Sequence, residues 1–486
     1  MKLTPAFWQR AFLAFTVGLF LSCAARVSGA QEPDRTKRPP SGPAVSLRVP
    51  AIQMRTLRNG IKVAVLEQHE LPVVAVRAVI DAASILDPAG KEGVASFTLQ
   101  MLSEGTTTRT ADQLADAMAD LGNGVTPGGF TTVSSNVDSS LTLLADMLLN
   151  PAFPQASLDR IKQNSIASLR RAKDLPGYLA RRVFVNVVWG AGHPYERAMN
   201  EQSVGAITRD DLVAFHARYY RPQNVRFVVA GDITPAQAVA KLERAFGKWP
   251  AGGFKSRYTI PAAKSAAPNT VYLFDRPNSP QSVFLIGGPG PARNTPDFFA
   301  IDVMNTAFGG AFTSRLNLNL RETHGYTYGA YSGFSFRMPP QPGEFVIQTS
   351  IATPKTDSAL VEIAKELKAV RGPKTLTAEE VAFAKSSAMK SLPLSFETVD
   401  QIAGAGATVL REGLPPDYYT TLNAKYRGVT AAQSNAAAMR YIDPAKLRIV
   451  IVGDRKAIEP ALRAANVGPV VVVDETGKPL PSTSSR

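Results

Sequence analysis

Two similar stretches, YYRPQNVRFVVAGD at residues 219–232 and RYIDPAKLRIVIVGD at residues 440–454, decide the fold. In each, a proline and an arginine precede a run of β-branched residues that closes on Gly-Asp, and the matching positions are equally far apart. Such runs predict buried strands. A helical pattern follows each one, PAQAVAKLERAF in the first half and KAIEPALRAA in the second. A repeat of this length indicates two similar domains rather than a short-period solenoid.

The segments between these repeats mix strand and helix patterns. Residues 56–84 predict two or three strands around an Asn59-Gly60 hairpin signal, and helical patterns follow at 157–172 and 176–188. Hairpin connections among the early strands favour an α+β fold, with two tandem homologous domains that are each a mostly antiparallel sheet backed by helices. We place the first domain at 46–252, a linker at 253–268, the second domain at 269–472 and a flexible tail at 473–486.

The N-terminal segment carries the features of a secretion signal. Residues 1–30 combine a charged start, the apolar run AFLAFTVGLFLS and the small residues Ser28-Gly29-Ala30, so we predict a signal peptide. Residues 31–45 are rich in proline and predict a tether. We expect export to the periplasm, with no transmembrane segment after the signal. A lipid anchor at Cys23, the only cysteine, is the weaker alternative because Phe20-Leu21-Ser22 matches a lipobox poorly.

The positive charge of the chain does not indicate nucleic-acid binding. The formal net charge is +14 at pH 7, but the lysines and arginines are spread along the chain without a long basic run. A binding face for nucleic acid gathers such residues in one patch or motif. A solvated basic surface is the interpretation that we adopt.

A candidate site lies in RLNLNLRETHGYTYGAY at residues 315–331. Leu316 and Leu320 mark a helix that Gly325 should end, and the alternating aromatic residues after it predict a strand. Arg321 then lies in the last helical turn and Tyr328 on the strand. A guanidinium and a phenol are suited to a developing oxyanion. The alternative is an arginine that only interacts with the helix dipole and a tyrosine that only packs.

The order of several segments resembles the pitrilysin/insulinase family of zinc peptidases. The resemblance covers about residues 50–470 and rests on LRNGIKVAVLEQ, GVASFTLQMLSEGT, AGHPYERAMN, YYRPQNVRFVVAGDI and SRLNLNLRETHGYTYGAYS. It implies tandem α+β domains that pair like a clamshell. In active members of the family, the segment equivalent to residues 93–106 carries His-x-x-Glu-His, whose two histidines bind zinc while the glutamate activates water.

This chain departs from the family at that motif. Ser96, Leu99 and Gln100 stand at the motif positions, and the downstream helix RIKQNSIASLRRAKD has no glutamate to serve as a third ligand. The four histidines, His69, His193, His216 and His324, include no pair three to five residues apart. We therefore expect no metal and no cofactor in this chain.

The Arg/Tyr pair, by contrast, matches the family. Arg321 and Tyr328 are seven residues apart in a local sequence similar to the one through which the second domain of active members polarises the scissile carbonyl. The resemblance implies the non-zinc subunit of a heterodimeric peptidase, with Arg321 and Tyr328 acting in trans on peptides or unfolded polypeptides. The zinc is then expected in a paralogous partner subunit. The alternative is a catalytically inactive peptide-binding or scaffold protein of the same origin.

Three further stretches carry structural expectations. The stretch Gly309–Ser314 resembles a glycine-bearing loop that holds substrate in some non-catalytic relatives, but we expect a plain loop that leads to Ser314 as a helix N-cap. The sequence Gly288-Pro289-Gly290-Pro291 predicts a rigid turn. Residues 126–137 predict an edge strand to which active relatives add their substrate, although Pro127 weakens it here.

Overall fold

The computed structural model describes residues 49–122, 124–253, 255–256, 258–338 and 341–481. The expected signal peptide, the Pro-rich tether and Cys23 lie outside these residues. Two β-sheets, each backed by helices, make up the described part, which confirms the α+β class. Within the described ranges, no helix combines the length and the apolar character needed to span a bilayer.

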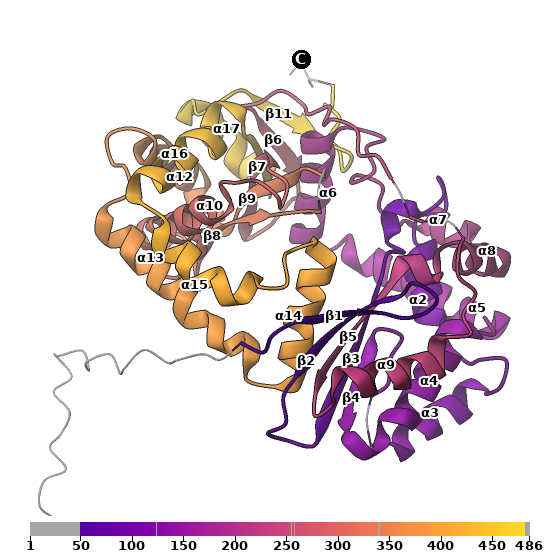
Figure 1. Cartoon of the computed structure of the whole chain (residues 1–486). Helices are drawn as coiled ribbons and strands as arrows, with labels where there is room; N and C mark the ends of the chain where they lie inside the picture. The colour runs from indigo at the N-terminus through magenta and orange to yellow at the C-terminus, as the bar shows by residue number, and fades with distance from the viewer. Residues whose placement is uncertain (1–48, 123, 254, 257, 339–340, 482–486) are drawn as a thin grey trace, which may run out of the picture. The chain divides into compact units, whose positions relative to one another are not determined.

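The first sheet has five strands in the order β1-β2-β5-β3-β4 (Figure 1). Its strands are β1 (Gln53–Thr56), β2 (Lys62–Glu67), β3 (Val73–Ile80), β4 (Gly129–Val133) and β5 (Val225–Gly231). The helices of this half are α2 (Val94–Met101), α3 (Ala111–Asp120), α4 (Val137–Leu149), α5 (Gln155–Ala172), α6 (Pro176–Trp189), α7 (Glu201–Ala206), α8 (Arg209–Tyr219) and α9 (Pro235–Phe246). β4 is the edge strand expected between residues 126 and 137, shortened to start at Gly129.

The second sheet has six strands in the order β11-β6-β10-β7-β9-β8. Its strands are β6 (Val271–Asp275), β7 (Gln281–Gly290), β8 (Ala330–Ser335), β9 (Gly343–Ala352), β10 (Arg448–Gly453) and β11 (Val470–Val473). The α-helices of this half are α10 (Phe298–Asn305), α11 (Arg315–Asn317), α12 (Thr356–Val370), α13 (Ala378–Ser391), α14 (Val399–Glu412), α15 (Tyr418–Gly428), α16 (Ala431–Tyr441) and α17 (Arg455–Ala465). Two π-helices, η4 (Thr306–Gly310) and η5 (Leu318–Thr323), adjoin α10 and α11.

The repeated stretches form the corresponding central strands of the two sheets. β5 pairs in parallel with β2 and antiparallel with β3, and β10 pairs in the same two ways with β6 and β7. The helices before them, α8 and α16, begin with equivalent threonine caps at Thr208 and Thr430. Three pairings in each sheet are antiparallel, as expected, but β2–β5, β6–β10 and β6–β11 are parallel pairs, so both sheets are mixed. The parallel pairs arise because each central strand returns after a long helical excursion, as parallel pairing requires.

The prediction of a turn at Gly288–Pro291 is wrong for its first three residues, which belong to β7. β7 continues through Gly290, with Pro289 opposite Glu344 and Gly290 opposite Gly343 on β9. Proline is tolerated at the end of a strand, where the loss of one N–H donor removes little of the ladder. Local turn propensity is therefore overridden by pairing with a strand that lies more than fifty residues later in the sequence.

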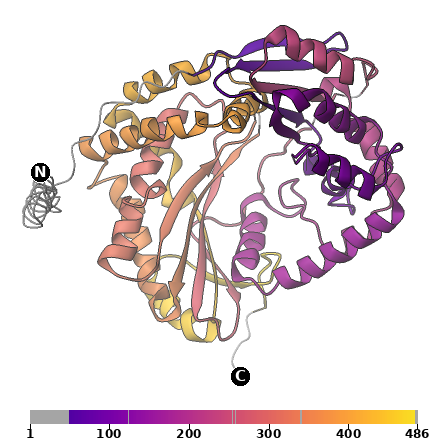
Figure 2. The same ribbon diagram turned by 90° about the horizontal axis from the view of Figure 1, so that it is seen from below.

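The two halves exchange a helix. One face of each sheet is covered by helices of its own half, and the opposite face is covered by a helix from the other half: α6 packs on β7 and β10, and α14 packs on β2, β3 and β5. Both views show magenta α6 beside the strands of the second sheet (Figures 1 and 2). The core formed by α6 joins Val183, Phe184 and Val187 to Leu285 and Val450.

Buried polar contacts fix α6 in this position. The Glu344 carboxylate, only 2% exposed on β9, accepts hydrogen bonds from Arg181 (2.6 Å) and from the indole N–H of Trp189 (3.1 Å). The last carbonyls of α6 accept hydrogen bonds from the segment expected as a linker: the Lys264 N–H donates to Trp189 O (2.9 Å), and the Ala266 N–H donates to Val187 O (2.7 Å). These donors satisfy carbonyls that a helix end leaves without intrahelical partners.

His69 ties the loop after β2 to the end of β5. Its Nδ1 lies 2.8 Å from Asp232 Oδ1, and Ser134 Oγ donates to the other oxygen of Asp232 (3.0 Å). The hydrogen bond to Asp232 raises the pKa of His69 above its ordinary value of 6.5, and the same bond lowers the pKa of Asp232. The pair therefore stabilises the fold between the ordinary pKa of aspartate and the raised pKa of His69.

We expect His69→Gln to make thermal stability less dependent on pH. A histidine whose pKa is raised by folding contributes fully below about pH 6.5, and its contribution is lost as the pH rises through the folded-state pKa. The difference in Tm between wild type and variant should therefore be largest at about pH 5.5, below the ordinary pKa of histidine, and should shrink as the pH rises through the raised pKa of His69. A difference that grows with pH would contradict this assignment.

Candidate active-site loop

The candidate stretch folds as a helix that changes type before it ends. α11 continues directly into the π-helix η5, which contains Arg321, and Gly325 follows with φ +64°. The stop predicted at Gly325 is confirmed, and its left-handed backbone explains why glycine stands there. π-helical turns are rare and occur frequently at functional sites.

A hydrogen-bonded loop separates Arg321 from Tyr328. The Gly325 N–H donates to Arg321 O (3.0 Å), and the Tyr326 N–H donates to Leu320 O (2.9 Å). The ring of Tyr326 stacks on His324, with centroids 4.9 Å apart. The backbone on which both candidate side chains are mounted is thus fixed by contacts that involve neither side chain.

Arg321 rests on an aromatic ring. Its guanidinium carbon lies 4.3 Å from the ring centroid of Phe312, and its Nε lies 3.5 Å from the Glu322 carboxylate. The side chain of Arg321 is about one third exposed. Stacking of this kind holds the plane of a guanidinium while leaving N–H groups at its edge able to donate to a ligand.

Tyr328 projects from the loop. It is 91% exposed and borders a hollow of about 410 Å³, which Gln281, Tyr331 and Gln348 also line. The expectation that Tyr328 lies on a strand is wrong, because β8 begins at Ala330. The side chain of Thr327 accepts from the Gly329 N–H (3.1 Å), and Thr349 Oγ1 donates to Gly329 O (2.9 Å). These side-chain bonds replace the ladder that a strand would need at this point.

Asn317 joins the parts of the site. Its side chain is fully buried, its Nδ2 donates to Phe312 O (2.7 Å), and its Oδ1 accepts from the Ala330 N–H (3.0 Å). One amide thereby fixes both the loop that carries Phe312 and the strand that follows Tyr328. The sequence reasoning missed Phe312 and Asn317. A polar residue between Leu316 and Leu320 is a signal that could have indicated a buried hydrogen bond.

The loop before this helix differs from the expectation. Gly309 and Gly310 belong to the π-helix η4, so the predicted plain loop is wrong at its start. Ser314 does occupy the N-cap position of α11, with an extended backbone. Its buried hydroxyl has no hydrogen-bond partner among the described residues, and Asn317 holds the turn instead. Position in the sequence therefore indicated where the helix begins but not how it is capped.

Asn317→Ala is expected to destabilise the chain by about 2–3 kcal/mol, because it leaves a buried N–H and a buried carbonyl without partners. Urea denaturation measures this loss. Asn164, exposed on α5, offers the control, and Asn164→Ala should change stability by less than about 0.5 kcal/mol. Equal effects of the two substitutions would show that the two hydrogen bonds of Asn317 contribute little.

The three positions that correspond to the family's zinc motif share one face of α2. Ser96, Leu99 and Gln100 are exposed, while Val94, Phe97 and the other apolar residues of the helix are buried. The helix therefore presents these three positions together, but they offer a hydroxyl, an alkyl group and an amide. Zinc in proteins is held by imidazole, thiolate and carboxylate groups, so these residues do not fit a resident zinc ion.

The four histidines each contact different partners. His193 Nε2 lies 3.1 Å from Pro261 O, and His216 Nε2 lies 2.9 Å from Leu148 O. Burial lowers the pKa of both. Throughout the described ranges, no three His, Cys, Asp or Glu side chains are grouped so that they could hold a metal ion.

Comparison with known proteins places these features in a family. A model described as insulinase (peptidase family M16) matches residues 62–183, and one described as the peptidase M16 inactive domain matches residues 206–388, so the two cover more than half of the chain. The chain belongs to the peptidase M16 family. This finding confirms the resemblance to insulinase and pitrilysin at the level of the family.

Other proteins resemble the chain over most of its length. An uncharacterized zinc protease of Rickettsia bellii is 26% identical over 71% of this chain and 83% of its own length. The non-peptidase homolog YmxG of Helicobacter pylori is 24% identical over 82% of this chain and 93% of its own. The crystal structure of a peptidase M16 inactive domain from Pseudomonas fluorescens aligns with a TM-score of 0.74 and 26% identity, covering 83% of this chain and 97% of that one.

Proposed function

We propose that this M16 protein is the non-zinc subunit of an exported, heterodimeric peptidase whose partner is a zinc-bearing paralogue. In this proposal, Arg321 and Tyr328 act in trans on a peptide or unfolded polypeptide bound at the partner's metal. The observation that carries the proposal is the fixed loop that leaves the Tyr328 phenol 91% exposed and the Arg321 guanidinium stacked on Phe312.

The chemistry of the two groups suits amide hydrolysis. When water adds to the scissile carbonyl, negative charge develops on the carbonyl oxygen, and positioned N–H and O–H donors stabilise it. The guanidinium of Arg321 and the phenol of Tyr328 can donate to that oxygen without first breaking a buried hydrogen bond of the fold. Each such donor commonly contributes a few kcal/mol to the transition state. Contact with a partner would exclude water from the loop and strengthen both interactions.

The face of α2 supports the assignment of zinc to another chain. Ser96, Leu99 and Gln100 lie together on that face, but they lack zinc-binding chemistry, and the adjacent helix α5 has no glutamate between residues 160 and 174. The M16 relatives include proteins described as zinc proteases and one described as a non-peptidase homolog. A family with both kinds of member is compatible with a division of labour between paralogous subunits.

A second function, an inactive peptide-binding or scaffold protein, is favoured by one comparison. The non-peptidase homolog of Helicobacter pylori covers more of this chain than the Rickettsia bellii zinc protease does. The two functions require different behaviour of the same residues. A scaffold needs the shape of the loop but gains nothing from the phenol hydroxyl of Tyr328.

Activity in a reconstituted mixture tests the proposal. The mature chain is assayed alone, after mixing with the M16 paralogue of the same genome that has an intact His-x-x-Glu-His, and after co-expression with it, on fluorogenic peptides and unfolded casein. We expect cleavage only when both chains are present, sensitivity to chelation, and co-elution of the two chains. An inactive co-expressed pair, or full activity of the paralogue by itself, would favour the scaffold.

We also propose that the mature protein is released into the periplasm after cleavage behind Ala30. N-terminal sequencing of protein from the periplasmic fraction should then begin at Gln31. A mature chain that starts at a lipidated Cys23 and fractionates with membranes would establish the anchored alternative.

A further inference from the structure

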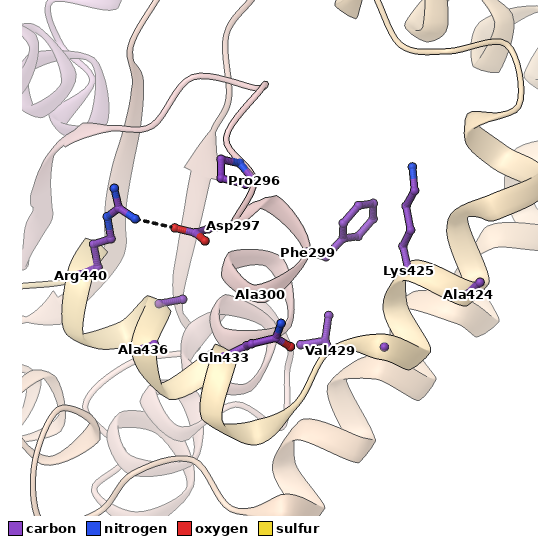
Figure 3. A pocket seen from close by; sticks show the side chains of 12 residues that line it. Pro296, Asp297, Phe299, Ala300, Ala424, Lys425, Val429, Gln433, Ala436 and Arg440 are labelled. Carbon is purple, nitrogen blue, oxygen red and sulfur yellow. Dashed lines mark hydrogen bonds and ion pairs between the residues drawn. The ribbon is translucent and has the colours of Figure 1, made fainter.

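The second half contains an open pocket that the proposed function does not use. It has a volume of about 570 Å³ and is formed by α10, α15 and α16 (Figure 3). Small side chains form its apolar surface, including Ala300, Ala424 and Ala436, and Phe299 and Val429 extend it. Its volume lies within the range of about 300–1,000 Å³ that is usual for small-molecule sites.

In the first half, the region equivalent to this pocket is bridged by an ion pair. α8 and α16 are equivalent helices, so Asp211 corresponds to Gln433, each three residues after a capping threonine. In the first half, Lys91 Nζ binds both oxygens of Asp211 at 2.6 and 2.7 Å. The duplication also places residues 90–105 of the first half opposite about residues 295–310 of the second, so Lys91 corresponds approximately to Pro296, which borders the pocket. In the first half, the Lys91–Asp211 ion pair links α8 to the start of α2. Among its described residues, the second half has no equivalent of this ion pair.

The polar groups left in the pocket are mainly donors. Gln433 Oε1 accepts from the N–H (2.9 Å) and Oγ1 (3.1 Å) of Thr430, so its NH₂ group remains available to a ligand. Asp297 is occupied by Arg440 at 3.0 Å and by the Tyr441 hydroxyl at 2.6 Å. Figure 3 shows this Asp297–Arg440 bond at one side of the pocket and Lys425 with Phe299 at the other.

Lys425 carries a positive charge that no carboxylate in the pocket balances, because Asp297 is already paired with Arg440. Its Nζ lies 5.7 Å from the ring centroid of Phe299 and 5.5 Å from that of Tyr418, and the described residues offer it no carboxylate partner. With Asp297 paired to Arg440, the pocket carries one unbalanced positive charge. A cation beside aromatic rings and an amide donor favours a ligand with a single negative charge and an apolar body.

We propose that this pocket binds a carboxylate attached to a compact apolar group. The carboxylate would pair with Lys425 Nζ, and the apolar group would lie on Phe299, Ala300 and Ala436. Such a group is presented by the C-terminal residue of a polypeptide and by a free hydrophobic carboxylic acid. The pocket shares no residue with the Arg321–Tyr328 loop, so it can be tested independently of the proposed peptidase function.

Fluorescence anisotropy with a labelled hexapeptide that ends in phenylalanine tests the site. We expect saturable binding of the free acid to the mature chain and at least about fivefold weaker binding of the same peptide with a C-terminal amide. Unlabelled N-acetyl-phenylalanine serves as the competitor. Competition at concentrations similar to those of the unlabelled peptide indicates a site for free acids, and much weaker competition indicates recognition of a polypeptide C-terminus.

Two substitutions locate the binding. Lys425→Met should weaken it at least about fivefold by removing the charge, and Ala436→Leu should do so by filling the exposed floor of the pocket. Lys456→Met, which removes the charge of an exposed lysine on α17 outside the pocket, should leave binding unchanged. The proposal is overturned if the acid does not saturate, if the amide binds equally well, or if both pocket variants, folded by circular dichroism, bind like the wild type.

Discussion

Tyr328→Phe and Arg321→Ala are each expected to lower kcat/KM of the assembled two-chain enzyme at least tenfold, which corresponds to about 1.4 kcal/mol of transition-state stabilisation. Removal of a single oxyanion donor can cost as much as about a thousandfold. The loss should fall mainly on kcat, because the donors engage most strongly after charge develops on the carbonyl oxygen. Neither substitution should alter folding, since the phenol is 91% exposed and the loop backbone is held by other groups.

Two control variants separate a direct role from a local disturbance. Tyr331→Phe removes a second phenol that borders the same hollow and should retain nearly full activity. Arg321→Lys keeps the charge but loses the flat, forked donor, so activity should be recovered only in part. If Tyr328→Phe is as active as Tyr331→Phe in the mixture, the loop only shapes the complex and the scaffold function is the better one.

A further prediction concerns the packing of α14 on the first sheet. Gly406→Ala is expected to lower the free energy of unfolding by about 1–2 kcal/mol, although alanine favours a helix by about 1 kcal/mol over glycine. A Cβ at Gly406 would lie 2.7 Å from Val228 Cγ1 and 2.9 Å from Leu66 Cδ1, both on the first sheet. Overpacking of this kind costs about 1–3 kcal/mol, which exceeds the gain in helix propensity.

The same helix provides the control. A Cβ at Gly404 would meet nothing within 4 Å, so Gly404→Ala should raise stability by about 0.5–1 kcal/mol. Urea denaturation, followed by circular dichroism, compares the two variants through the midpoint of the first transition. Stabilisation by both substitutions would mean that α14 sits more loosely on the first sheet than its packing indicates.

Regularities within short segments were predictable from the sequence. The two repeats that end in Gly-Asp identified the central strands, because runs of β-branched residues between turn signals usually form buried strands. Gly325 identified a helix end, because that position has a left-handed backbone, which favours glycine. Leu316 and Leu320 are buried as the helical spacing predicts. The positions of Ser96, Leu99 and Gln100 on one face of α2 follow from the same periodicity.

Features that depend on distant parts of the chain were not predictable in this way. Tyr328 leaves the strand because Thr349, on another strand, bonds to Gly329. The Gly288–Pro291 segment extends β7 because β9 pairs with it. No local pattern distinguishes a helix that packs on its own sheet from one such as α6, which packs on the other sheet. The π-helical turn at Arg321 likewise has no signature in the periodicity of the leucines.

The reciprocal placement of α6 and α14 makes the two sheets interdependent. Each half contributes one helix to the sheet of the other half, so one face of the first sheet stays uncovered until α14 has been synthesised. A ribosome-bound N-terminal half would expose the apolar face that α14 later occupies, and folding chaperones would have that face available during synthesis. A mature chain cut once near residue 260 would remain a single particle. The N-terminal fragment would still contribute α6 to the second sheet, and the C-terminal fragment would still contribute α14 to the first.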